Sequence, residues 1–66
     1  MSAITWYRSE DFVTGMQDGV PVVQIERLST NLWEVVVRVV PISVEAFSTL
    51  GAAKAWATRQ VRLVGA

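Results

Sequence analysis

Gln17-Asp18-Gly19-Val20 lies between two runs in which apolar and polar residues alternate. An Asp-Gly pair in this position is a strong signal of a β-hairpin, because a type I′ turn needs positive φ at both central residues. We therefore expect Asp18 and Gly19 at the tip of a hairpin. Pairing outward from the tip sets four residue pairs opposite each other: Met16 and Pro21, Thr14 and Val23, Phe12 and Ile25, and Glu10 and Arg27.

Ser29-Thr30-Asn31 is the second predicted turn, a three-residue connection in which Asn31 takes the left-handed conformation. A two-residue loop would instead mix polar and apolar positions on one face of the sheet. The preferred register gives three cross-strand pairs and one apolar face. The pairs are Ile25 with Val35, Val23 with Val37, and Arg27 with Trp33; the face carries Phe12, Met16, Val23, Ile25, Trp33, Val35, Val37 and Val39, with Trp6 in phase.

Pro41 should end the third strand, since proline cannot donate a hydrogen bond to a strand ladder. Residues 42–46 then form either a short edge strand or an extended link. Ser48 or Thr49 is a suitable N-cap for a helix over residues 50–64, in which apolar residues cover about half of the circumference. We expect residues 1–66 to be a single α+β domain. It would have an antiparallel meander of three strands, or four with the edge strand, and one C-terminal helix packed on one face.

Size and composition favour an oligomer. A chain of 66 residues buries only about 60% of the surface that its unfolded form exposes. The sequence has no cysteine and no histidine, which excludes disulfides and zinc sites built from thiolate or imidazole ligands. A partner chain is the remaining source of stability, so a homodimer is expected.

Membrane insertion and secretion are not expected. No run approaches the roughly 20 apolar residues of a transmembrane helix, and Arg8, Glu10 and Asp11 come too early for a signal peptide. The chain is therefore expected to be cytoplasmic. The sequence also lacks a histidine base, a cysteine nucleophile, a glycine-rich phosphate loop and a nucleophile elbow. We expect a protein that is not an enzyme and that needs no cofactor.

The outward face of the predicted sheet carries a further set of apolar residues. A contiguous apolar set on one sheet face indicates an interaction site, whereas scattered apolar residues are ordinary. Self-association or the docking of a protein partner is therefore the first functional hypothesis, for an interaction or regulatory module. The residues are Val13, Val22, Leu28, Leu32, Val36 and Val40.

Two alternatives remain open. Lys54, Arg59 and Arg62 lie in a segment without acidic residues and offer contacts to DNA or RNA phosphates, although cations near a helix C-terminus also stabilise the helix itself. In the predicted register three carboxylates lie side by side, where they either hold a divalent cation at a metal-dependent or catalytic site between subunits, or form an ordinary solvated face. These carboxylates are Asp11, Glu26 and Glu34.

The segment Phe47-Ser48-Thr49-Leu50-Gly51-Ala52-Ala53 resembles the strand-to-helix joint of the AP2-like or arm-type DNA-binding modules at the N-termini of phage integrases. Phe47, Thr49 and Ala53 match the pattern, whereas Ala52 replaces its acidic residue. The resemblance implies a three-stranded sheet with a C-terminal helix. The compact chain also looks like a small accessory protein of a phage or mobile element. The basic sheet with which those modules contact DNA is missing.

Overall fold

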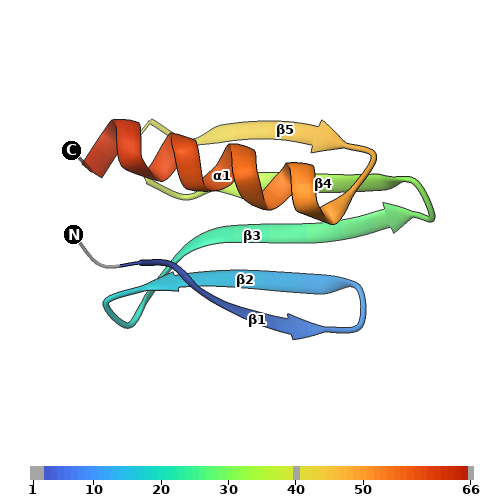
Figure 1. The fold of residues 1–66 in the computed structure, drawn as a ribbon, viewed down its shortest axis with the longest axis horizontal. Coiled ribbons are helices and arrows are strands. Elements are labelled where there is room, and N and C mark those ends of the chain that lie inside the picture. The colour runs from blue at the N-terminus through green and yellow to red at the C-terminus, as the bar shows by residue number, and fades with distance from the viewer. Residues whose placement is uncertain (1–2, 40, 66) are drawn as a thin grey trace.

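The structure, a computed structural model, describes residues 3–39 and 41–65. They form one antiparallel sheet of five strands in the order β1-β2-β3-β4-β5, followed by one helix (Figure 1). This confirms the α+β class, but the predicted number of three or four strands is wrong. The elements are β1 (Thr5–Ser9), β2 (Phe12–Gln17), β3 (Val20–Ser29), β4 (Leu32–Val37), β5 (Ser43–Phe47) and α1 (Leu50–Gly65).

The additional N-terminal strand results from a turn that the sequence analysis missed. Glu10 and Asp11 form a tight connection in which Ser9 pairs with Phe12, and Glu10 takes a φ of 39°. Left-handed φ is uncommon for glutamate, so no residue preference marks this turn. Glu10 therefore does not pair with Arg27 as predicted. At the other edge, residues 43–47 form a strand that pairs with β4, which is the edge-strand alternative.

The hairpin between β2 and β3 has the predicted tip, with φ of 53° at Asp18 and 78° at Gly19. Met16 pairs with Pro21 as expected, but the register then shifts between Gly15 and Met16. A bulge adds one residue to a strand and reverses the alternation beyond it. The predicted pairs of Thr14 with Val23 and of Phe12 with Ile25 are therefore wrong. Instead, Gly15 pairs with Val23 and Val13 pairs with Ile25.

This bulge exchanges residues between the two faces of the sheet. Val13 is fully buried, whereas Phe12 is 44% exposed. Val22, the extra residue on β3, belongs to the core together with its neighbour Val23. Two positions expected on the outward face, Val13 and Val22, are thus core residues.

The β3–β4 register agrees with the prediction at Ile25–Val35, Val23–Val37 and Arg27–Trp33. The turn itself differs, because Ser29 pairs with Leu32 and the connection is Thr30-Asn31. Asn31 does not have positive φ. A second register shift, between Arg27 and Ser29, leaves Leu28 as the extra residue and compensates for the shorter turn.

The helix begins at a threonine cap, as one of the two predicted alternatives required. The backbone N–H of Ala52 donates to Oγ1 of Thr49 over 3.2 Å. Small residues on its buried face, Ala53 and Ala57, let α1 lie close to the sheet, and Val61 continues this face. The helix covers β3, β4 and β5 and leaves the β1–β2 hairpin uncovered (Figure 1).

The core lies between sheet and helix. Trp33 is 6% exposed there, and the rings of Phe47 and Trp56 pack with their centroids 5.6 Å apart. On the uncovered hairpin, partly buried side chains of Ile4 and Trp6 extend the core over Gly15. The fully buried side chains of the sheet are Val13, Val23, Ile25, Val35 and Val37.

Candidate interaction surface

The face of the sheet opposite α1, here called the outer sheet face, has no second layer within the described residues (Figure 1). The strand registers place one unbroken row of side chains across all five strands in its middle. Alternation along each strand puts this row on the side away from the buried residues. The row consists of Tyr7, Thr14, Gln24, Val36 and Val44.

Large apolar side chains on this face are open to solvent. Tyr7 is 60% exposed and Val44 is 58% exposed, at opposite ends of the row. Phe12 and Leu32 are also exposed, on β2 and β4. Thr14 and Gln24 lie between the apolar ends of the row, so the exposed apolar side chains gather toward the two edges of the face. Exposed apolar patches bordered by polar residues are typical of a contact with another molecule.

The structure distributes the six predicted partner-binding residues differently from the prediction. Leu28 and Leu32 are exposed, and Val36 is half-buried in the central row. Val13 and Val22 are buried because of the bulge, so neither offers surface to a partner. Val40 lies outside the described residues.

Three apolar members of the outer sheet face were not predicted, namely Tyr7, Phe12 and Val44. Tyr7 was missed because β1 was not recognised, although Ile4-Thr5-Trp6 directly before it alternates between apolar and polar residues. Phe12 was assigned to the core by the register without a bulge. Val44 lies on β5, which the sequence left as either a strand or a link.

The predicted row of three carboxylates is not formed. Glu26 and Glu34 are direct cross-strand partners, but Phe12 occupies the neighbouring position on β2. Asp11 lies in the β1–β2 turn, where its Oδ1 is 3.9 Å from Nε of Arg27 and its carbonyl accepts from the Arg27 N–H over 2.7 Å. Within residues 3–39 and 41–65, no three acidic side chains come close enough to hold a metal ion.

The three helix cations lie within about 140° of the helix circumference, which is less than half of it. Nζ of Lys54 lies 5.5 Å from the ring centroid of Trp6, on the side of the helix that faces the β1–β2 hairpin. Arg62 follows about two turns later and about 80° around the helix from Lys54, and Arg59 lies about 60° beyond Arg62. Two further arginines, Arg8 and Arg27, lie over the ring of Trp33 with distances of 5.6 and 5.9 Å to its centroid.

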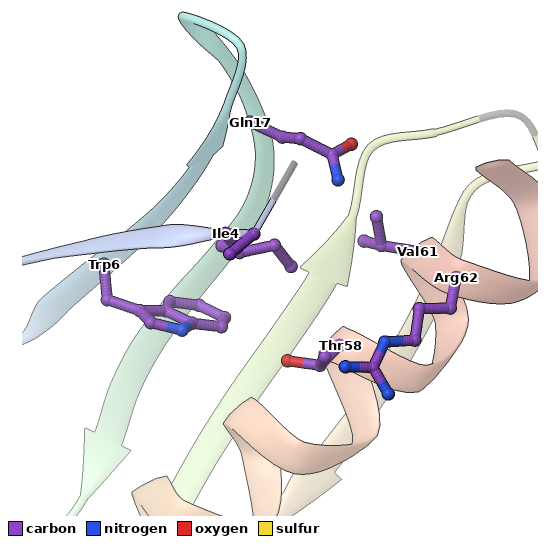
Figure 2. Close-up of a pocket in the computed structure, with 7 residues that line it drawn as sticks. Ile4, Trp6, Gln17, Thr58, Val61 and Arg62 are labelled. Carbon is purple, nitrogen blue, oxygen red and sulfur yellow. The ribbon is translucent and has the colours of Figure 1, made fainter. Parts of the chain in front are cut away.

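A cavity of about 300 Å³ lies between the β1–β2 hairpin and the C-terminal half of α1. Figure 2 shows Ile4, Trp6 and Gln17 on the sheet side and Thr58, Val61 and Arg62 on the helix side. The cavity exists because the helix covers only part of the sheet. The cavity was not predicted from the sequence, because its two walls come from segments about 50 residues apart.

Comparison with known proteins gives no relatives for this chain: no family model, curated protein or solved structure matches it. In the described part of the chain, no helix has the length and the apolar character that crossing a membrane requires.

Proposed function

We propose that this protein is a non-enzymatic interaction module that acts as a homodimer through its outer sheet face. The observation that supports this proposal is the central row of that face, which spans five strands and ends in exposed Tyr7 and Val44. Two sheets that pack face to face bury such rows against each other at a separation of about 10 Å. A second copy of the chain would thereby supply the missing layer.

Charge along β4 supports a second copy as the partner. Glu34 lies two residues before Val36 on the outer sheet face, and Arg38 continues the same alternation two residues after it. A two-fold axis that runs along the central row would set Glu34 of one chain opposite Arg38 of the other. The surface is thus complementary to itself, as a two-fold interface requires.

The size of the chain supports the same proposal. A single helix covers only part of one sheet face, so few large side chains are buried. The largest fully buried side chains are those of Ile25 and four valines. Domains with cores this small usually gain stability from disulfides, metals or association. The sequence contains no cysteine for the first of these.

Sedimentation equilibrium with two matched lysine substitutions tests the proposal. Wild-type protein at micromolar concentration should show about twice the 7.3 kDa monomer mass. Val44→Lys adds a charge to the outer sheet face and should give monomers. Leu63→Lys makes the same change at a 69% exposed residue of the helix and should leave the dimer intact. A monomeric wild type, or a Val44→Lys variant that is still a dimer, would contradict the proposal.

If the wild type is monomeric, the outer sheet face remains available to a different protein, and the homodimer is excluded. Charge reversal distinguishes an interface from a fold defect. Glu34→Arg should weaken the dimer by opposing Arg38 of the partner copy, while it removes the repulsion with Glu26 inside each chain. Arg38→Glu added to Glu34→Arg should restore the dimer.

A nucleic-acid-binding module is the second candidate, because residues 46–66 carry three cations and no acidic residue. Binding to an oligonucleotide should then weaken steeply with salt, since each neutralised phosphate releases counterions. Replacing Lys54, Arg59 and Arg62 together with glutamine should abolish it. Micromolar binding at about 150 mM salt that these changes remove would favour this candidate over the first.

A further inference from the structure

The cavity between the β1–β2 hairpin and α1 lies on the opposite side of the sheet from the proposed dimer interface. Its volume of about 300 Å³ is at the lower end of the range for small-molecule sites, which begins near 300 Å³. Ligand sites of this kind are mainly apolar and contain a few polar groups that set orientation. Both kinds of group are present here.

The apolar floor of the cavity depends on Gly15. Trp6 is the direct cross-strand partner of Gly15, and a Cβ on Gly15 would lie 2.9 Å from side-chain carbons of both Ile4 and Trp6. The missing side chain therefore lets the indole lie flat against β2. Lys54 approaches the same ring to 5.5 Å from the helix. A cation over an aromatic face is attractive by about 0.5–1 kcal/mol at exposed sites, which helps to hold the indole in position.

The helix wall supplies the polar groups. Arg62 lines the cavity with a guanidinium group, and no acidic residue of the described chain pairs with it within 4.0 Å. The hydroxyl of Thr58 donates to the carbonyl of Lys54 over 2.8 Å. Its oxygen is therefore left to accept a hydrogen bond from a ligand rather than to donate one.

We infer that this cavity binds a small aromatic monocarboxylate that carries a hydroxyl group. The aromatic ring would pack against Trp6, Ile4 and Val61 (Figure 2). The carboxylate would pair with Arg62, and the hydroxyl would donate to Oγ1 of Thr58. The planar fork of a guanidinium group suits a carboxylate. An uncharged aromatic ligand would form no ion pair with Arg62. An aromatic acid without a hydroxyl group would donate no hydrogen bond to Thr58.

Titration with 4-hydroxyphenylacetate, followed by NMR, tests the inference on the wild-type protein. The indole N–H resonance of Trp6 should shift and saturate at millimolar ligand or below, whereas that of Trp33, buried under Arg8 and Arg27, should move less. Arg62→Gln should weaken binding by about tenfold. Arg59→Gln removes an exposed charge from the same helix outside the cavity and should leave the affinity unchanged.

A second pair of measurements isolates the hydroxyl. Wild-type protein should bind 4-hydroxyphenylacetate about fivefold more tightly than phenylacetate, and Thr58→Val should remove this preference. An unsaturated or absent shift of Trp6, equal losses in Arg62→Gln and Arg59→Gln, or a preference that survives Thr58→Val would overturn the inference. None of these outcomes depends on the oligomeric state.

Discussion

Gly15 lies on β2 beneath two side chains of the preceding segment. A Cβ at this position would meet Ile4 and Trp6 at 2.9 Å and Val23 at 3.1 Å. Its φ is not positive, so the position needs glycine for space rather than for backbone freedom. Small residues thus serve packing at both layers of this fold, since Ala53 and Ala57 also let the helix approach the sheet.

We expect Gly15→Ala to destabilise the protein by about 1–3 kcal/mol, because overpacking a filled site forces neighbours to shift. The indole of Trp6 should move, which near-ultraviolet circular dichroism detects. Gly51→Ala is the matched control, since a Cβ there meets nothing within 4 Å. It should stabilise the helix by up to about 1 kcal/mol. Equal effects of both changes in urea unfolding would show that Gly15 has no packing role.

At the scale of elements, the sequence predicted those features that depend on local chemistry. The Asp18-Gly19 turn has the positive φ that its residues favour, and Thr49 caps the helix with its hydroxyl. The two register shifts were not predictable in the same way. Nothing local marks Leu28 as extra, whereas Pro21, directly before Val22, indicates a bulge because proline inside an inner strand is confined to such positions. The packing of β2 against β3 and the core determines that the bulge lies at Val22.

The bulge makes a specific prediction for β3. Strict alternation would turn either Val22 or Val23 away from the core, but with the bulge both are buried, at 7% and 0% exposed. Val20, which precedes the bulge, is 56% exposed. Val22→Thr should cost about 1–3 kcal/mol, since it buries a hydroxyl in an apolar site. Val20→Thr should change the free energy of unfolding by no more than about 0.5 kcal/mol. Similar costs in thermal melts would contradict the bulge.

The Glu26–Glu34 pair gives a second prediction at this scale. Like charges directly opposite each other on neighbouring strands repel. Glu26→Gln should therefore raise stability at neutral pH by a few tenths of a kcal/mol, about the size of a cross-strand pair. Added salt should reduce the gain through screening. Glu45→Gln, at an exposed residue opposite Val35, is the control and should have little effect, because a glutamine oxygen can still accept the hydrogen bond that the Ala46 N–H donates to Oε1 of Glu45 over 3.2 Å. A loss of stability in Glu26→Gln, or a melting temperature that calcium raises in the wild type alone, would indicate a cation site.

At the scale of the whole molecule, the sequence indicated an unpartnered apolar sheet face but gave only part of its composition. Val36 was identified because its part of β3 and β4 has the predicted register. Leu28 and Leu32 are exposed as well, although the register shift at Leu28 changes the pairing next to the turn. Tyr7 and Val44 belong to edge strands whose existence depends on pairing with β2 and β4. Such pairing is a long-range property, and a single-sequence pattern does not contain it.

Coupling between folding and association yields the last prediction. If the outer sheet face is buried only in the dimer, unfolding releases two chains, and stability rises with protein concentration. A hundredfold increase adds about 1.4 kcal/mol per chain, which shifts the melting temperature of a domain this small by roughly 5–10 °C. The melting temperature of Val44→Lys should be lower than that of the wild type and should not change with protein concentration. The melting temperature of Leu63→Lys should depend on concentration as that of the wild type does. If the wild-type melting temperature is the same at 5 and 500 μM, about a hundredfold range, the chain folds without a second copy. The outer sheet face then stays exposed to water in the folded monomer.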